Sequence, residues 1–244
     1  MTPEFLDRGP QKAAGVISAW RDLAAAGTEI WVGEIAASWH SGQEGWTDRF
    51  GDIFWYADAL AARAALNHTG FCRQSFVGGN YELLDRYSFA PNPDFYVAQL
   101  FGQLMGPVVL SARVSGSRKL RAWAQCQSPG VLTLLLINLA NDTSFTLPLS
   151  SIDGADASTR FDYEFSSGAD ANATAAEALV SQRIRLNGVR LQPAGDTLPS
   201  LTDLRQAATG QPTIIVMPQT VRFVVFEDLA APACYPPLTS SLTP

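Results

Sequence analysis

The chain has 244 residues, with 17 basic and 23 acidic side chains and a formal net charge of −6. Hydrophobic residues make up 47% of the chain, which is typical of a globular protein with a core and excludes an intrinsically disordered segment. The acidic balance and the scattered Lys and Arg residues exclude nucleic acid as a partner, because neutralising phosphates requires a basic surface.

Helix and strand patterns alternate along the first hundred residues. We expect helices over residues 10–26, 48–66 and 92–105, and short strands over residues 29–34 and 71–76. The apolar positions at helical spacing in the first helix are Val16, Ile17, Trp20 and Leu23. Those in the second are Phe50, Phe54, Ala57 and Ala61. Helices and strands in this order predict a parallel α/β sheet, and a complete (β/α)8 barrel would use about 250 residues.

After Gly106-Pro107 the hydrophobic pattern changes from helical to alternating. We therefore place a domain boundary there, with residues 1–106 as an α/β part and residues 107–244 as an antiparallel β-sandwich. The expected strands are 108–114, 119–126, 131–139, 144–149, 161–165, 182–186, 213–217 and 220–227. Residues 151–178 are mostly small and polar, which indicates that part of them is a mobile loop.

Polar side chains follow both strands of the α/β part. Glu34 ends the first strand, and Gln74, Asn80 and Tyr81 lie in or after the second. In a parallel barrel the carboxyl ends of neighbouring strands share one rim, so these residues are expected to converge there. A carboxylate among aromatic rings and hydrogen-bond donors is typical of a sugar site. The alternatives are that Glu34 is a solvated loop residue and that the second loop is a glycine turn with a packed tyrosine.

Several segments of the chain resemble heparanase and the heparanase-like β-glucuronidases, glycoside hydrolase family 79. The segments that carry the resemblance are residues 31–34, 73–76, 79–85, 93–96, 104–106, 134–139 and 185–188. Their order and spacing extend over nearly the whole chain, from about Phe5 to Cys234. The resemblance implies a retaining glycosidase with a (β/α)8 barrel followed by a β-sandwich. It further implies that this chain is the C-terminal part, with only the last two barrel strands.

Site residues follow from the resemblance where the motifs match. In the family, the nucleophile is the glutamate of a motif like Trp-Leu-Gly-Glu, which falls on Glu34 in this chain. Gln74 and Tyr81 match positions that reach the glucuronate subsite, Gly79 matches a backbone contact, and Trp39 and Asn80 are placed beside them. The acid/base glutamate of the family follows an Asn, and no glutamate of this chain has that context.

The loop after the nucleophile departs from the family pattern. The family often has Tyr-Gly-Gly-Gly where this chain reads Trp39-His40-Ser41-Gly42. Backbone N–H groups there are expected to receive the sugar carboxylate, although the side chain of His40 narrows the approach. His40 is interpreted either as a proton donor or as a loop histidine that stacks near Trp39.

The cysteines and sequons indicate the compartment. The resemblance implies a disulfide between Cys126 and Cys234, and Cys72 is expected to be a buried free thiol in the second strand. N-x-S/T sequons, possible glycosylation sites, occur at Asn67, Asn141 and Asn172. These features favour an extracellular, lysosomal/vacuolar or membrane-associated protein. No signal peptide is expected at Met1, and no membrane span.

Two functional hypotheses follow. The first is a retaining β-glucuronidase of heparanase type whose partners are a glucuronate-containing oligo- or polysaccharide and the missing N-terminal barrel portion. The second is a non-catalytic truncated chain whose β-sandwich is a structural or carbohydrate-contact module. Neither hypothesis requires a cofactor, and the cysteine and histidine spacing predicts no metal site.

Overall fold

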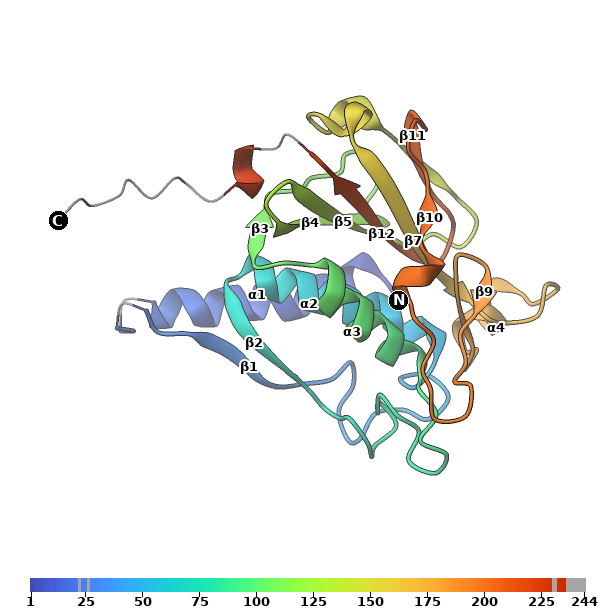
Figure 1. Ribbon diagram of the computed structural model, residues 1–244. Coiled ribbons are helices and arrows are strands. Elements are labelled where there is room, and N and C mark those ends of the chain that lie inside the picture. The colour runs from blue at the N-terminus through green and yellow to red at the C-terminus, as the bar shows by residue number, and fades with distance from the viewer. Residues whose placement is uncertain (22, 26, 230–231, 236–244) are drawn as a thin grey trace.

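An antiparallel sheet lies in the middle of the molecule, with helices on one face and a small second sheet on the other (Figure 1). Figure 1 shows the computed structural model, which describes residues 1–21, 23–25, 27–229 and 232–235. None of the helices within these ranges is long and apolar enough to cross a membrane.

The α/β part consists of three helices and two parallel strands. The helices are α1 (Pro3–Trp20), α2 (Ile53–Ala65) and α3 (Pro93–Leu104), and the 3-10 helix η1 (Phe50–Asp52) leads into α2. Strands β1 (Ile30–Ile35) and β2 (His68–Arg73) pair in parallel, as expected. The expected apolar face of α2 is confirmed, because Phe50, Phe54, Ala57 and Ala61 are all buried.

The first helix differs from the prediction at both ends. Thr2 caps it by accepting a hydrogen bond from Phe5 N, and Pro10 lies inside it rather than at its start. Its buried residues, Leu6, Ala13 and Ile17, form one stripe that continues across Pro10, so packing overrides the proline signal. The helix ends at Trp20, whereas the prediction extended it to residue 26, which lies outside the described residues. The predicted stripe is also wrong at Val16, Trp20 and Leu23, which are exposed.

The large sheet has the strand order β3-β4-β5-β12-β7-β8-β9, with β10 beside β7, and a two-stranded sheet joins β6 to β11. The strands are β3 (Val108–Leu110), β4 (Leu120–Ser128), β5 (Val131–Asn138), β6 (Phe145–Pro148), β7 (Thr159–Ser167), β8 (Ile184–Leu186), β9 (Val189–Arg190), β10 (Gln206–Ala207), β11 (Thr213–Val216) and β12 (Thr220–Glu227). The short helices are η2 (Leu149–Ser151), η3 (Ala155–Ala157), α4 (Ala175–Leu179), η4 (Thr202–Leu204) and η5 (Pro232–Cys234). Thus η3, β7 and the start of α4 occupy much of the segment expected to contain a mobile loop.

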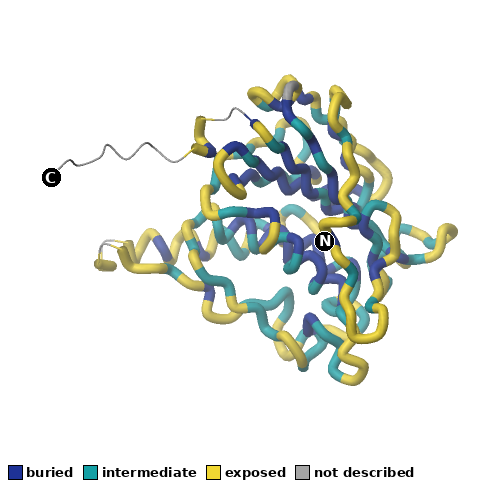
Figure 2. Tube along the Cα trace, viewed as in Figure 1, coloured by how far each residue is buried: buried dark blue, intermediate teal, exposed yellow. Residues whose placement is uncertain are grey.

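Alternation along β5 and β12 builds two cores from one sheet. Leu135 and Phe223 face α2 and α3, whereas Leu134 and Val224 face β6 and β11. Figure 2 shows the buried residues running along this sheet and along the helices beneath it. Because the helix-side core draws on both halves of the chain, the helices and the large sheet form one packed body.

The cysteines divide into a bridged pair and one free thiol. Cys126 of β4 and Cys234 of η5 form the disulfide that the resemblance implies, with a Cα–Cα distance of 5.3 Å. The expectation that Cys72 is buried is wrong, since its side chain is exposed. Its neighbour Phe71 packs toward the helices, so Cys72 points to the other face of β2, which no described element covers.

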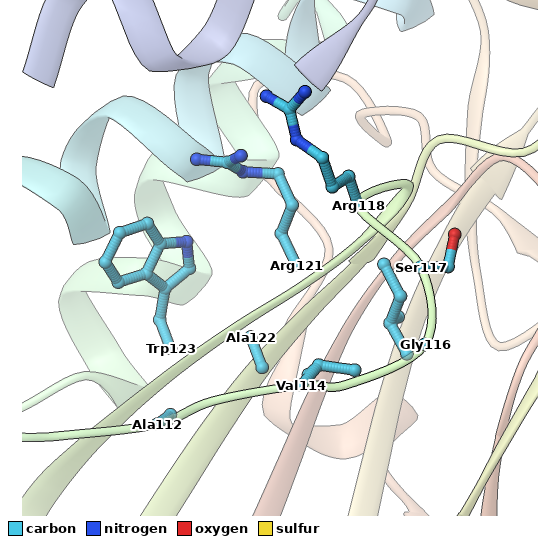
Figure 3. A pocket seen from close by; sticks show the side chains of 9 residues that line it. Ala112, Val114, Gly116, Ser117, Arg118, Arg121, Ala122 and Trp123 are labelled. Carbon is cyan, nitrogen blue, oxygen red and sulfur yellow. The ribbon is translucent and has the colours of Figure 1, made fainter. Parts of the chain in front are cut away.

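A buried carboxylate joins the helices to the sheet. Asp58 of α2 accepts hydrogen bonds from Arg121 Nε at 2.6 Å and from Trp123 Nε1 at 2.9 Å, and both donors come from β4. Arg121 also contacts Asp7 of α1 at 2.8 Å. Figure 3 shows the side chains of Arg118, which lies just before β4, and of Arg121, which lies in β4, extending toward the helices. Both residues line a cavity of about 430 Å³.

Replacing Asp58 with Ala is expected to lower the free energy of unfolding by about 2 kcal/mol, because the partly buried Arg121 and Trp123 donors lose their shared acceptor and Arg121 keeps only Asp7. Denaturant unfolding of the chain measures the loss. The matched control is Glu4→Ala, which breaks the exposed Arg118 ion pair and should have a much smaller effect, because solvent screens exposed charges. Equal effects of the two substitutions would contradict the assignment.

Candidate active site

A β-bulge sets the direction of Glu34 at the end of β1. Val32 pairs with Phe71 and Ile35 pairs with Arg73, so β1 has one residue more than β2 in this interval. Val32 is buried and Ile35 packs against the helix-side core, while Glu34 is exposed. A bulge commonly re-aims a side chain beside an active site, and here it leaves the carboxylate of Glu34 free of the core.

The pocket at this end of the strands gathers most of the residues expected in the site. It has a volume of about 420 Å³ and contains Glu34 together with Trp39, His40, Gln74 and Tyr81. The other lining residues are Val32, Ile35, Ala36 and Ser38 from β1 and the loop after it, Lys12 of α1 and Arg63 of α2. The pocket thus extends from the carboxyl ends of the strands to residues of both helices.

Gly79 and Asn80 are not among the residues that line this pocket, but they position the loops that form its wall. A Cβ on Gly79 would lie 2.7 Å from the Tyr81 ring, so only glycine allows the loop to pack on that ring. Asn80 N donates to Ser41 O, and the carbonyl of Asn80 accepts from Thr47 Oγ1. These bonds join the loop after β1 to the loop after β2, which makes the pocket one connected structure.

The loop after β1 adopts a left-handed backbone at three successive positions. The φ angles are 54° at His40, 67° at Ser41 and 78° at Gly42. A side chain at such a φ is disfavoured, and glycine is the usual residue there. The backbone of His40 and Ser41 therefore has the shape that glycines adopt readily, although this chain carries side chains at both positions.

Arg73, at the last position of β2, positions the neighbouring site residues through buried contacts. Its guanidinium Nη2 contacts Asp94 at 2.6 Å and Asp52 at 3.2 Å, and it donates to Tyr81 O at 2.9 Å. It also lies over the rings of Trp55 and Tyr56, 5.0 and 4.5 Å from their centroids. Strand β2 is thereby tied to the start of α2 and of α3, and Gln74 follows directly in the chain.

Two carboxylates share this one guanidinium. Burial raises the pKa of Asp52 well above its usual value, and the neighbouring Asp94 raises it further, while Arg73 opposes both effects. The pKa of Asp94 is raised as well, chiefly by burial. Burial lowers the pKa of Arg73, but the two carboxylates outweigh it and the net direction is upward. A proton held between Asp52 and Asp94 reduces the charge repulsion.

The sequence analysis did not assign a role to Arg73, Asp52, Asp94 or Glu82. Glu82 is buried and accepts hydrogen bonds from Gly78 N and from Arg86, which closes the loop after β2. The signal available in the sequence was an arginine at the end of a short strand that lies between two helices, with Asp52 at the N-cap of α2 and Asp94 in the first turn of α3. Such a residue needs a buried partner, and a helix start supplies one.

The pocket contains one carboxylate, Glu34, among its lining residues. A retaining glycosidase uses two carboxyl groups about 5 to 5.5 Å apart. The pocket therefore contains one carboxylate where the resemblance predicts a pair. Within the described residues, no group of three or more His, Cys, Asp and Glu side chains could hold a metal ion. The sequon residues Asn67, Asn141 and Asn172 are all exposed.

Comparisons with known proteins identify relatives of one kind. The chain is 34% identical over 228 residues to heparanase-like protein 1 of Arabidopsis thaliana, covering 84% of this chain and 42% of the relative. It is 32% identical over 198 residues to baicalin-β-D-glucuronidase of Scutellaria baicalensis, covering 80% of this chain and 35% of the relative. The chain thus spans less than half of the length of these relatives. No family model matches it.

Solved structures show the fold. The chain superposes on the family 51 α-L-arabinofuranosidase of Thermotoga petrophila with a TM-score of 0.57 and 12% identity, covering 92% of this chain and 48% of that one. The structural neighbours are glycoside hydrolases with TIM-barrel folds. The mixed helices and strands of this chain correspond to part of such a molecule.

The Asp52–Arg73–Asp94 cluster predicts a pH effect on stability. Because the folded-state pKa of Asp52 is raised, its protonation stabilises the fold at low pH, and this contribution is lost as the pH rises through that pKa. Asp52→Asn is therefore expected to gain stability relative to the parent chain as the pH rises from about 4 to 8. Denaturant unfolding at several pH values measures the trend.

The control is Asp85→Asn. Hydrogen bonds from Ser88 lower the pKa of Asp85, so its contribution is present at neutral pH and is lost as the pH falls. Relative to the parent, Asp85→Asn should therefore show almost no trend between about pH 4 and 8, and should gain stability only below about pH 4. A flat difference for Asp52→Asn would show that the cluster holds no extra proton.

Proposed function

Because the chain belongs to the heparanase-like group of glycoside hydrolases, we propose that it is the C-terminal part of a retaining β-glucuronidase with Glu34 as the nucleophile. The observation that carries the proposal is the pocket that brings Glu34 together with Gln74 and Tyr81 from a different strand and loop. The names of the relatives indicate the class of activity, and the pocket indicates which residues of this chain would take part in it.

In the proposed reaction, the Glu34 carboxylate attacks the anomeric carbon of glucuronate and forms a covalent glycosyl-enzyme. A carboxylic acid outside this chain protonates the leaving oxygen and then, as a carboxylate, activates the water that releases the sugar. Gln74 and Tyr81 hold the glucuronate, with Gly79 and Asn80 shaping the wall beside them. Trp39 offers an exposed ring at the mouth of the pocket.

The left-handed loop supports a role in binding the sugar carboxylate. Successive backbone N–H groups in such a turn form a concave anion site. His40 and Ser41 have the required φ angles, so their side chains do not prevent this shape. The imidazole of His40 lines the pocket and narrows the approach, which favours a contact with the substrate over a role in the chemical step.

The domain assignment is part of the proposal. Residues 1–106 would be the last strands and helices of a (β/α)8 barrel, and residues 107–244 a β-sandwich. Strand β1 pairs with β2 and with no other described strand, and Trp31 and Trp20 are 62% and 64% exposed. Unpaired strand edges and exposed apolar residues are what a missing N-terminal barrel portion would cover.

The alternative function remains a non-catalytic module. It is favoured by the single carboxylate in the pocket, since one member of a retaining pair cannot complete the reaction. In that case, the large sheet and the disulfide would serve a structural or carbohydrate-contact role. Exposed sequons and the disulfide support an extracellular, lysosomal or vacuolar location for either function.

The nucleophile assignment is tested in the chain joined to the missing barrel portion. Glu34→Gln should abolish turnover of an aryl glucuronide and leave the fold intact, because the amide cannot attack the anomeric carbon. A mechanism-based glucuronidase label should attach to Glu34 in the parent. The matched control is Glu44→Gln, which changes an exposed glutamate of the neighbouring loop and should leave turnover unchanged.

Labelling of another carboxylate would refute the assignment. The 244-residue chain alone is expected to show no turnover, since its pocket lacks the acid/base group. Turnover by the chain alone that is lost in Glu34→Gln would mean that a second carboxylate of this chain completes the site.

The charge of the chain predicts the preferred substrate. A net charge of −6 opposes a densely sulfated glycan such as heparan sulfate, so we expect a glucuronate-bearing glycan of lower charge, such as an arabinogalactan-type side chain. Comparing kcat/KM of the complete enzyme for both substrates measures the preference. A strong preference for heparan sulfate would overturn this expectation.

A further inference from the structure

We propose that a second pocket beside the site receives the ring that follows glucuronate in the substrate, and that Trp46 is the residue on which this ring packs. The inference rests on the proposed function, because it assumes that glucuronate occupies the pocket of Glu34. The second pocket has a volume of about 230 Å³, and its apolar walls include Phe5, Trp46 and Leu179.

The two pockets adjoin through one residue. Ser38 lines both of them, with Trp39 in the first and Trp46 in the second. Both tryptophans belong to the loop after β1, and they are 84% and 58% exposed. Ser38 is thus a wall common to both pockets, and in the proposal the substrate passes over it from the glucuronate position to the second pocket.

The backbone around Trp46 is held in place. Trp46 N donates to Gln43 O at 3.1 Å, and Thr47 N donates to the same oxygen at 3.0 Å. Thr47 Oγ1 accepts from Gln43 N at 2.8 Å and also donates to the Asn80 carbonyl. An exposed indole on an anchored loop offers a preformed apolar surface, which reduces the entropy cost of binding a ring.

The opposite wall comes from a distant part of the chain. Leu179 ends α4, which lies between β7 and β8, and Ser181 O accepts a hydrogen bond from Phe50 N at 2.8 Å. Gly51 lies against Leu179, where an added Cβ would be 3.1 Å from the Leu179 carbonyl oxygen. The segment between β7 and β8 therefore packs on the start of α2 and forms this wall of the pocket.

The lining favours an uncharged ring. Asp52 has the one ionisable side chain among those that line the pocket, and its carboxyl group is already bonded to Arg73 at 3.2 Å. No lining side chain offers a cation to a sulfate or a second carboxylate, and the α-ammonium group of Met1 is a cation at this pocket that joining the N-terminal portion would remove. A neutral sugar and an aromatic aglycone both present an apolar face of the kind that packs on an indole, so they share the chemistry that this pocket fits.

The test uses the 244-residue chain labelled with 5-fluorotryptophan and observed by 19F NMR. Trp39→Phe, Trp46→Phe and Trp20→Phe assign three of the resonances, and Trp20 serves as the exposed control outside the site. The probes are methyl β-D-glucuronide, 2-naphthyl β-D-glucuronide, and β-D-glucuronosyl-(1→6)-galactose. Methyl glucuronide is expected to shift Trp39 alone, and at least one of the two longer probes to shift Trp39 and Trp46 together.

The naphthyl and galactose arms distinguish an aromatic aglycone from a neutral sugar as the preferred ring. A shift of Trp39 by every probe, with no shift of Trp46, would overturn the inference and leave the proposed function standing. No shift at either tryptophan would count against both. A Trp46 response that disappears when the missing N-terminal portion is joined to the chain, while Trp39 still responds, would assign the pocket to that portion and overturn the inference.

Discussion

The buried ion pair of Arg73 with Asp52 and Asp94 is the interaction on which the geometry of the site depends. A guanidinium inside a protein is costly unless it is paired, and here the pairing also determines where β2 ends relative to α2 and α3. Removing either carboxylate would leave the other to balance the charge alone. Because Gln74 follows Arg73 and the Tyr81 carbonyl accepts from the same guanidinium, the two proposed glucuronate contacts share one anchor.

The sequence predicted that Glu34, Gln74 and Tyr81 lie close together, and the structure shows which backbone features allow this. Glu34, Gln74 and Tyr81 were expected on one rim because parallel strands end together, and they line one pocket. Alternation alone would have placed Glu34 on the same face as Val32. The bulge before Ile35 decides its direction, and a single sequence carries no clear signal for an extra residue in a strand of this length.

The sequence analysis failed where tertiary contacts override local signals. Pro10 suggested a helix start, but Leu6, Ala13 and Ile17 bury one continuous stripe through it. The second strand was expected over residues 71–76, whereas β2 ends at Arg73, because Arg73 turns into the cluster and Gln74 begins the loop. Cys72 was expected to be buried by analogy with a complete barrel. Burial of that face requires neighbouring elements that the described chain does not provide.

The large sheet is covered on both faces, whereas β1 and β2 are covered on one face only. This difference explains why the fold is well packed while the proposed site lacks a second carboxylate. The large sheet buries both of its faces, one against α2 and α3 and the other against β6 and β11, so it does not require a further layer over these strands. Strands β1 and β2 bury only the face that α2 and its neighbours cover, and the face of Trp31 stays exposed. A parallel pair of this kind is stable mainly through the helices behind it. The proposed nucleophile Glu34 also needs a second carboxylate, which its pocket does not contain. The same missing neighbours would therefore complete the hydrophobic packing and the chemistry, which is why we favour part of an enzyme over an independent module.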